Sequence, residues 1–463
     1  MDKFDVAVIG SGPGGYVAAI RAAQLGASVA LVEKEYLGGT CLNWGCIPTK
    51  ALIASAEMLH NMRQASQFGI TLDGEVRPDW PAVIKGKNEI VKGLRQGVAG
   101  LLKANRVKVL TGHGSFDSRR RIRVRAPGQE TCLECDHTIL ATGSVSVKPS
   151  FIPPSDHIVY SRQALDLTEL PESMIVLGGG VIGCEFACMF ARFGVNVTVV
   201  EMLPEILSMA DRDIVRVVRT SMKKMGIEVL TGQPLEKIKA TGKGVSGKVG
   251  KDTVQAKKML VCVGRRPFTD GLGLPAAGLD TDDRGLIAVD QQCRTKVSGI
   301  YAIGDLTGNL QYAHRASAQG LVAAANTTGD RQKHSDALVP SCIFTSPEIG
   351  SVGLTEEEAK QNQRQVRTGK FRFASLGKAR IRRQTEGFCK ILADPETDQV
   401  LGVHIVGPHA TDLIAEAVTA MNLEITAAEL GRAMHAHPTL SEATMEAAED
   451  VHQKSIHMPP PRR

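Results

Sequence analysis

The stretch Asp5-Val-Ala-Val-Ile-Gly-Ser-Gly-Pro-Gly-Gly15 is the part of the sequence most informative about the fold, because it joins an apolar run to a glycine-rich turn. A short apolar run of this kind is typical of a strand buried in a parallel sheet. The stretch Ser173-Met-Ile-Val-Leu-Gly-Gly-Gly-Val-Ile-Gly183 repeats the pattern, and Glu201 follows Glu33 at the same offset of 168 residues. Each copy predicts a strand, a turn, a helix, a second strand and then an acidic residue.

The glycine spacing in each copy is what a dinucleotide-binding unit needs. The first glycine allows a tight turn, the second lets a pyrophosphate approach the backbone, and the third lets helix and strand pack closely. The start of the helix offers unpaired N–H groups to phosphates, and the acidic residue can accept hydrogen bonds from a ribose. The predicted contacts are Gly10, Gly12, Gly15 and Glu33 in the first copy and Gly178, Gly180, Gly183 and Glu201 in the second.

Two such units in one chain predict two different nucleotides. A flavin and a nicotinamide form the natural pair, because a hydride can pass between them. Glu201 favours NAD over NADP, because a carboxylate repels the 2′-phosphate that distinguishes NADP.

Composition sets the broad class. The chain has 463 residues, of which 43% are hydrophobic and 22% charged, and this balance predicts a soluble globular protein of two to four domains. The net charge is +6 and we find no element with clustered Lys and Arg, so we expect no nucleic-acid partner. A signal core and an apolar run of about 18 residues are both absent, and most of the ten cysteines stand alone in apolar runs. We therefore expect a cytoplasmic protein without a membrane partner.

One cysteine pair differs from the others. The segment reads Gly38-Gly-Thr-Cys41-Leu-Asn-Trp-Gly-Cys46-Ile-Pro-Thr-Lys50 and leads into a predicted helix over 51–60. A thiol at the start of a helix has a lowered pKa, and its thiolate can attack a disulfide or donate electrons to a flavin. Lys50 is four residues after Cys46 and shares its helix face. We favour a redox pair over a structural disulfide, which a chain of this size does not need.

The cysteine segment resembles the redox-active disulfide of the class I pyridine nucleotide–disulfide oxidoreductases, in the branch of the dihydrolipoamide dehydrogenases. The similarity continues along the whole chain. The motifs that carry it are Ala141-Thr-Gly143, Gly264-Arg-Arg-Pro267, Tyr301-Ala-Ile-Gly304-Asp305 and His435-Ala-His437-Pro438-Thr-Leu-Ser-Glu442.

The resemblance implies a role for each catalytic residue. Cys41 and Cys46 form a disulfide against one face of FAD, and NAD stacks on the other face. Cys46 contacts the flavin and Cys41 exchanges with the substrate. His437 is the acid–base group, and Glu442 holds and polarises its imidazole.

The resemblance also implies the remaining cofactor contacts. Lys50 and Glu185 pair near the flavin and tune its potential. The other implied FAD contacts are Thr40, Gly114, Thr142, Gly143, Ser144, Asp305 and Ala313, and Gly264 joins the NAD contacts. We expect no metal site, because Cys132 and Cys135 lack a second ligand pair.

The expected architecture is α/β, with two Rossmann-like dinucleotide-binding domains and a C-terminal α+β dimerisation domain. The predicted bounds are 1–148 for the FAD domain, 149–264 for the NAD domain, 265–335 for a central domain that completes the FAD site, and 336–463 for the interface domain. The resemblance implies a homodimer in which His437 reaches the disulfide of the other subunit.

The predicted function is oxidation of protein-bound dihydrolipoamide to lipoamide with reduction of NAD. The protein would then be the E3 component of a 2-oxoacid dehydrogenase or glycine cleavage complex, and its partners would be lipoyl domains. The alternative is an NAD(P)H-dependent flavoprotein reductase of another disulfide or acceptor. A non-enzymatic flavoprotein subunit is a third reading, and the complete set of catalytic residues argues against it.

Three further residues carry expectations. Trp44 lies between the two redox cysteines, and we favour a packing role for it over a role in the substrate channel. Arg192 is expected to be a surface charge. The last cysteine is Cys389, so the chain lacks the C-terminal redox pair of the mercuric and large thioredoxin reductases.

Overall fold

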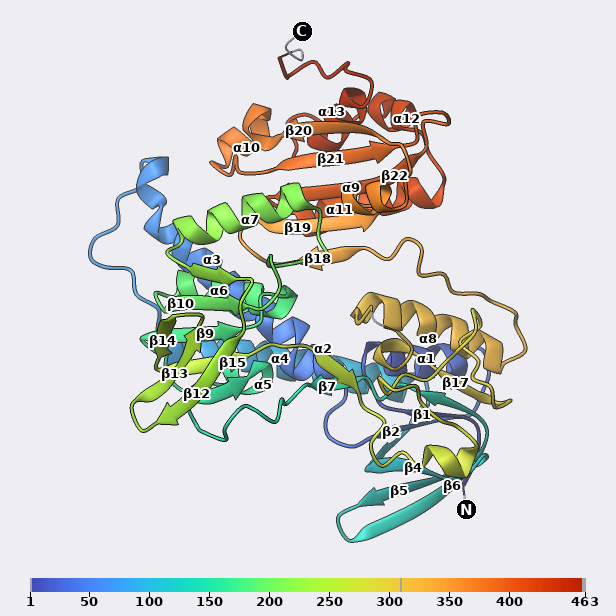
Figure 1. The fold of residues 1–463 in the computed structure, drawn as a ribbon. Helices are drawn as coiled ribbons and strands as arrows, with labels where there is room; N and C mark the ends of the chain where they lie inside the picture. Colours follow the sequence, from blue (N-terminus) through green and yellow to red (C-terminus); the bar gives the residue numbers. More distant parts are fainter. Residues whose placement is uncertain (1, 309, 460–463) are drawn as a thin grey trace.

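The computed structural model describes residues 2–308 and 310–459, which form three units (Figure 1). The first unit, at the lower right of the view, is built on a sheet of strand order β3-β2-β1-β6-β5-β4, with β17 pairing to β6. Strands β3, β2, β1, β6 and β17 run parallel, whereas β4 and β5 are antiparallel. The bounds are β1 Asp2–Ile9, β2 Val29–Glu33, β3 Lys108–Thr111, β4 His113–Ser118, β5 Arg121–Ala126, β6 Gln129–Leu140 and β17 Ile300–Ala302.

The helices of the first unit lie in two regions. Helices α1 and α8 pack together beside the sheet, whereas α3 and α4 extend toward the second unit (Figure 1). Pro13 begins α1, where its missing N–H costs nothing. The bounds are α1 Pro13–Gln24, α2 Gly39–Trp44, α3 Cys46–Arg63, η1 Ala65–Phe68, α4 Trp80–Ala104, η2 Leu274–Ala277, η3 Gly304–Leu306 and α8 Ala313–Thr327.

The second unit repeats the first. Its main sheet has the order β11-β10-β9-β15-β8 and is parallel, and a smaller antiparallel sheet of β12, β13 and β14 lies beside it. A short ladder of β7 and β16 connects the two units. The bounds are β7 Ser144–Ser146, β8 Ile158–Tyr160, α5 Ser161–Ala164, β9 Ser173–Leu177, α6 Val181–Arg192, β10 Asn196–Glu201, α7 Arg212–Lys224, β11 Glu228–Thr231, β12 Leu235–Thr241, β13 Gly244–Val249, β14 Asp252–Ala256, β15 Lys258–Val261 and β16 Arg265–Pro267.

The third unit, at the top of Figure 1, is an antiparallel sheet of order β18-β19-β22-β21-β20 with helices against it. Helix α11 packs on β19 and β22, and α13 packs on β20 and β21. The bounds are β18 Ser341–Ile343, β19 Glu348–Gly353, α9 Glu356–Gln361, β20 Arg367–Arg372, η4 Phe373–Ser375, α10 Gly377–Ile381, β21 Phe388–Ala393, β22 Val400–Gly407, α11 Ala410–Asn422, α12 Ala427–Arg432 and α13 Glu442–Asp450.

The predicted fold class is confirmed. Both dinucleotide units have the expected order of strand, turn, helix and strand, and the third unit is α+β. The run Phe388-Cys-Lys-Ile-Leu-Ala393 predicts a strand, and it forms β21. The stretch 427–434 predicts a helix, and the helix observed there ends earlier, at Arg432. The four domain bounds given above stay predictions. Within the described residues, no helix has the length and apolar character needed to cross a membrane.

The expectation of no basic cluster was wrong, because five arginines gather on β5 and the turn before it. Neighbouring acceptors pair with these arginines, so their guanidinium groups do not form an open basic surface for phosphates. Asp117, Glu130 and Asp136 pair with four of them, and Arg119 donates to the Ser298 carbonyl. The five residues are Arg119, Arg120, Arg121, Arg123 and Arg125.

A buried charge cluster fastens the third unit to the second. Lys390 on β21 is 1% exposed, and its Nζ donates to both oxygens of Asp211 at 3.1 and 2.9 Å. Glu356 contacts the same ammonium at 2.5 Å. Burial alone would lower the pKa of Lys390, but the bonds from Glu356 and Asp211 outweigh it and raise the pKa. Asp211 caps α7 and is fully buried, so this carboxylate depends on Lys390 for its charge balance.

Lys390→Met is therefore expected to destabilise the protein by about 3–5 kcal/mol, because the substitution leaves the buried Asp211 carboxylate without its cation. The measurement is the shift in melting temperature of the purified holoenzyme. Lys370→Met is the matched control, since Lys370 pairs at 3.0 Å with the more exposed Asp213 and such a pair contributes about 1 kcal/mol or less. Equal shifts for the two variants would contradict the role of the cluster.

Candidate functional site

One cavity of about 1880 Å³ lies between the glycine-rich turns of the first two units. Most of the site residues expected from the sequence line this cavity. They include residues of both glycine-rich turns, both cysteines and the first residue of α8. The cavity-lining members of that set are Gly10, Gly12, Glu33, Thr40, Cys41, Cys46, Lys50, Gly114, Thr142, Gly143, Ser144, Gly178, Gly180, Glu185, Glu201, Gly264, Asp305 and Ala313. Four expected residues do not line it: Gly15, Gly183, His437 and Glu442.

The two turns have the same geometry. Gly10 and Gly178 have φ of +99° and +111°, a region that favours glycine. A Cβ on Gly15 would meet the Gly10 carbonyl oxygen at 1.9 Å, and a Cβ on Gly183 would meet that of Gly178 at the same distance. The third glycine of each turn therefore serves helix–strand packing behind the cavity, as its position in the pattern predicts.

The two acidic residues are held in place by backbone donors. Glu33 accepts from the Ser11 N–H at 3.0 Å and the Ser11 hydroxyl at 2.6 Å, and its other oxygen accepts from the Glu35 N–H. Glu201 accepts from the Gly179 N–H at 2.7 Å and the Leu203 N–H at 2.8 Å. Both carboxylates are thus fixed at the edge of the cavity, where they can accept hydrogen bonds from ribose hydroxyls.

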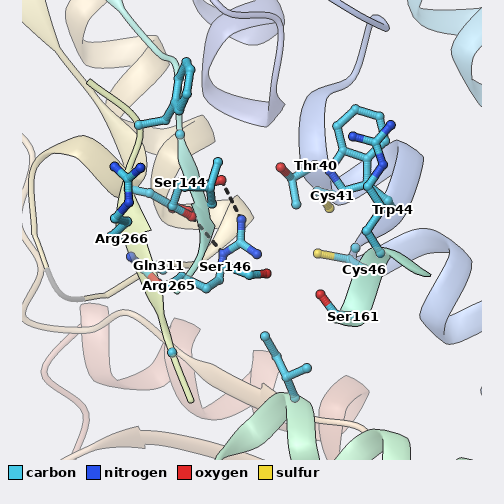
Figure 2. Close-up of a pocket in the computed structure, with 18 of the residues that line it drawn as sticks. Thr40, Cys41, Trp44, Cys46, Ser144, Ser146, Ser161, Arg265, Arg266 and Gln311 are labelled. Carbon is cyan, nitrogen blue, oxygen red and sulfur yellow. Dashed lines mark hydrogen bonds between the residues drawn. The ribbon is translucent and has the colours of Figure 1, made fainter. Parts of the chain in front are cut away.

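A polar wall faces the cysteines across the cavity (Figure 2). Arg265 donates from Nε to the Ser144 hydroxyl at 2.8 Å and from Nη2 to the Ser144 carbonyl at 2.6 Å. The Ser144 hydroxyl donates to Asp305 at 2.5 Å. Burial lowers the pKa of Arg265, and Asp305 opposes that effect. Thr142 donates to the Phe268 carbonyl at 2.6 Å, so its side chain braces this wall.

Cys41 lies within α2, and Cys46 is the first residue of α3. Both thiols are free, and Cys46 is exposed to the cavity, toward which its sulfur points in Figure 2. A hydrogen bond from the Cys41 thiol lowers the pKa of Cys46 to about 7, with help from the Lys50 ammonium and against the opposing effect of burial. The same hydrogen bond raises the pKa of Cys41. One thiolate and one thiol therefore coexist near neutral pH.

Lys50 and Glu185 form the pair that the resemblance implied. Lys50 Nζ lies 3.0 and 2.8 Å from the two oxygens of Glu185, whose residue is 4% exposed. The Phe344 N–H, from the third unit, donates to the same carboxylate at 2.9 Å. Glu185 therefore accepts hydrogen bonds from two elements that are distant in sequence, α3 and the third unit. The carboxylate fixed in this way holds the ammonium of Lys50, which lies one helical turn after Cys46.

His437 and Glu442 meet in the third unit. His437 Nδ1 and Glu442 Oε1 are 2.8 Å apart, and the second carboxylate oxygen accepts from the Thr439 N–H at 2.8 Å. Burial alone would raise the pKa of Glu442, but the His437 and Thr439 bonds outweigh it and lower the pKa. The His437 side chain is 77% exposed. The pair is formed, but within a single chain the structure does not bring it to Cys41.

Trp44 packs against neighbouring side chains and also lines the cavity. The Arg162 guanidinium lies 3.9 Å from the centre of its ring, and Tyr36 meets it edge-on with centroids 6.3 Å apart. Arg162 also pairs with Glu35. The indole lines the cavity beside both cysteines (Figure 2). It packs as expected and also shapes one wall of the site.

Arg192 is not the surface charge that its sequence position predicted. Its side chain is 14% exposed rather than at the surface, it lies 3.4 Å from Glu57, and it donates to the Ser346 hydroxyl. The expectation failed because the residues that cover Arg192 come from α3 and from the third unit. Cys184 and Cys188 are buried in the core. The described residues contain no cluster of three or more His, Cys, Asp or Glu that could hold a metal.

Several groups at the site were not predicted from the sequence. Arg265 stands in a quoted motif, and its buried contact with Ser144 is long-range. Ser11 lies inside the first glycine pattern, where its hydroxyl could have been matched to Glu33. Phe344 gave no local signal, because its partners are on α3 and α6.

The cavity fits two dinucleotides. A Cβ on Gly12 or Gly180 would meet no atom within 4 Å, so each turn has open space on the side where a pyrophosphate would approach. The fixed Glu33 and Glu201 carboxylates suit two riboses, and Asp305 is placed on the wall of the first unit. The cysteines and the Lys50–Glu185 pair lie between the two turns, where a flavin ring and a nicotinamide ring would meet.

Comparison with known proteins agrees with this geometry. Residues 4–320 match the family model described as pyridine nucleotide-disulphide oxidoreductase, and residues 339–448 match the dimerisation domain of that family. The chain belongs to the pyridine nucleotide-disulphide oxidoreductase family. Members use FAD and NAD(H), and the dimerisation domain supports a homodimer.

Relatives within the family match over the full length. The chain is 43% identical to the dihydrolipoyl dehydrogenase of Chlamydia pneumoniae, covering 99% of both chains. It is 44% identical to a dihydrolipoyl dehydrogenase of Bacillus subtilis, covering 98% of this chain and 99% of the relative. Among solved structures, LpdA from Mycobacterium tuberculosis has a TM-score of 0.90 at 29% identity, over 97% of this chain and 99% of that one. The HOCl-induced flavoprotein disulfide reductase RclA from Escherichia coli has a TM-score of 0.87 at 28% identity, over 96% and 99%.

Proposed function

We propose that this oxidoreductase is a dihydrolipoyl dehydrogenase that oxidises protein-bound dihydrolipoamide and reduces NAD⁺. The observation that carries the proposal is the pair formed by Cys41 in α2 and Cys46 at the start of α3, because both line one cavity shared by two dinucleotide turns. Full-length relatives with that activity support it.

The chemistry is a thiol–disulfide exchange coupled to reduction of a nicotinamide. A substrate thiolate attacks the Cys41–Cys46 disulfide at Cys41, and the Cys46 thiolate leaves. The second substrate thiol then displaces Cys41, which releases cyclic lipoamide and leaves both cysteines reduced. FAD bound in this cavity would supply two-electron redox chemistry between the reduced cysteines and NAD⁺, with Cys46 as the cysteine that faces it, and the Cys41–Cys46 disulfide would form again. The balance is one dithiol oxidised to a disulfide and one NAD⁺ reduced to NADH, with release of one proton.

The residues of this chain supply the proton and charge control. Lys50, held by Glu185, stabilises the Cys46 thiolate, which makes it a good leaving group, and the Cys41 thiol adds a hydrogen bond to this thiolate once both cysteines are reduced. His437 takes the proton of the substrate thiol, and Glu442 orients its ring through Nδ1 so that Nε2 remains for the substrate.

A second copy of the chain completes the site in this proposal. His437 is exposed and lies outside the cavity of its own chain. The dimerisation domain that contains it supports a homodimer. We place His437 of one subunit against Cys41 of the other, so that a monomer would bind both nucleotides but lack the acid–base group.

The partners follow from the substrate. The lipoyl group is carried by a lipoyl domain of a 2-oxoacid dehydrogenase or glycine cleavage complex, and free dihydrolipoamide can replace it in an assay. We place the protein in the cytoplasm, where free thiols such as those of the buried Cys184 and Cys389 persist.

The second candidate is an NAD(P)H-dependent reductase of another disulfide or acceptor. The likeness to RclA, described as a flavoprotein disulfide reductase, favours it. The Arg162–Trp44 stack narrows the site beside the cysteines and is a feature on which substrate choice can depend.

A substrate and nucleotide panel separates the two candidates. We expect kcat/KM for dihydrolipoamide with NAD⁺ to exceed that with NADP⁺ by about 100-fold, because the Glu201 carboxylate repels a 2′-phosphate. Glutathione disulfide with NADH or NADPH should give little turnover. Comparable efficiency with glutathione disulfide would favour the second candidate, and equal use of NADP⁺ would contradict the role of Glu201. A purified protein whose flavin is not bleached by NADH would contradict both.

A further inference from the structure

Two ion pairs connect α3 to α6. Lys50 meets Glu185 at 2.8 Å, and Glu57 meets Arg192 at 3.4 Å. On both helices the paired residues are seven apart, close to two turns, so each helix presents them on one face. The charges are reversed between the two pairs, since α3 supplies the cation in the first and the anion in the second.

A loop of the third unit contacts both ion pairs. The loop covers 344–347 between β18 and β19, and its Phe344 N–H donates to Glu185 at 2.9 Å. Two residues later, the Ser346 hydroxyl accepts from Arg192. Thr345, between them, is buried and donates to the Pro347 carbonyl at 2.7 Å, which holds the loop in shape. The third unit therefore reaches the redox centre through this loop.

The Phe344 ring adds a second contact to the first ion pair. Lys50 Nζ lies 4.5 Å from the centre of the ring, within the range of a cation–π interaction. The ammonium thus lies against the Glu185 carboxylate and also over the face of an aromatic ring. Phe344 lines the cavity together with Lys50, Glu185 and Cys46.

We propose that Phe344 is a positioning residue of the redox site: its ring and its N–H hold the Lys50–Glu185 pair where it acts on Cys46. The N–H fixes the carboxylate, and the carboxylate and ring together fix the ammonium. Lys50 is one turn after Cys46 on the same helix, so an ammonium held there stabilises the thiolate. The inference rests on the proposed redox role of Cys46.

A purely structural role for the ring is the competing explanation. Phe344 packs against the core cluster that includes α3 and α6, and it borders a small cavity beside Arg192. If the ring only filled space, its removal would lower stability without changing the charge balance at Cys46. The test must therefore follow the Cys46 thiolate as well as the stability of the protein.

The experiment is a pH titration of the two-electron-reduced holoenzyme of Phe344→Leu, which loses the ring and keeps the N–H. The readout is the long-wavelength absorbance that a thiolate produces beside a flavin. In the wild type this band should titrate near the pKa of about 7 that the structure gives Cys46. In Phe344→Leu the midpoint is expected to rise by about 0.5 or more, because Lys50 is held less firmly. Phe344→Tyr keeps the ring and should restore the wild-type midpoint.

Phe388→Leu is the matched control. Phe388 lies in the same unit, and its ring is 3.9 Å from another ammonium, that of Lys370, which does not line the cavity. This variant should lower the melting temperature and leave the midpoint of the band unchanged. If Phe344→Leu does not fold, Phe344→Met replaces it, since methionine keeps most of the volume without an aromatic face.

Several outcomes would overturn the inference. These are an unchanged midpoint in Phe344→Leu, an equal shift in Phe388→Leu, or a shift in Phe344→Tyr as large as that in Phe344→Leu. Failure of the proposed function looks different, because the wild-type protein itself would then show no long-wavelength band on reduction.

Discussion

Cys46→Ser is expected to lower turnover of dihydrolipoamide with NAD⁺ by about 10⁴-fold or more, because a serine cannot form the disulfide that accepts the substrate electrons. Cys46 faces the cavity, and its pKa of about 7 makes it the thiolate of the pair. Lowering the pH below 7 protonates this thiolate, so the wild-type rate of NADH formation, which depends on the thiolate, should fall as the pH decreases below 7. The measurement is steady-state NADH formation across pH.

Cys132→Ser is the control for this variant. Cys132 lies on β6, is half-buried like Cys41 and does not line the cavity, so its substitution should leave turnover within about twofold of wild type. The Cys46→Ser protein should still bind flavin, and NADH should still bleach it, because Cys41 and Cys46 act only on the dithiol side. Retained turnover of dihydrolipoamide in Cys46→Ser would refute the disulfide mechanism.

His437→Gln is expected to lower the same turnover by about 10²–10⁴-fold, the usual contribution of a general acid–base group. Glutamine can still donate to Glu442, so the fold of this segment should persist, but it cannot take a proton from the substrate thiol. Loss should be smaller at high pH, where the substrate thiol ionises without help. The measurement is the pH dependence of kcat/KM, and reduction of the flavin by NADH should be unaffected.

His452→Gln provides the comparison. His452 is also in the third unit and also meets a carboxylate, Asp398, at 3.1 Å. Substitution there should leave both the rate and its pH dependence close to wild type. A pH profile of His437→Gln that parallels the wild type, however slow the variant, would speak against proton transfer by His437. Mixing His437→Gln with Cys41→Ser subunits adds a test of the shared site, since a mixed dimer keeps one intact pair of Cys41 and His437.

The parts of the fold that the sequence predicted are those with local causes. The strand, turn, helix and second strand that open each dinucleotide unit form one continuous segment, and the glycines at its turn report contacts within that segment, such as that of Gly15 with Gly10. Strand β21 was predicted with its observed bounds, because the run that forms it is mostly apolar. The end of α12 was predicted two residues too late, although Gly431, next to the last helical residue Arg432, is a local signal for it.

The site was predicted where motifs are long and missed where contacts cross between units. One short segment contains Cys41, Cys46 and Lys50, and their spacing in it indicates a redox cysteine pair. Arg192 was misread because its own helix gives no sign of Glu57 or Ser346, which cover it. Phe344 lies 159 residues from Glu185, and no pattern in the sequence relates them.

Glu185 depends on three segments that fold in different parts of the molecule: α3, α6 and the loop before β19. Local opening of any one of them breaks at least one hydrogen bond of this carboxylate, and such openings need less free energy than complete unfolding. Warming should therefore disturb the redox centre while most of the helices and strands remain intact. Heat inactivation of this enzyme would then begin as a reversible loosening at one junction, and cooling would restore activity for as long as the main sheet of each unit survives.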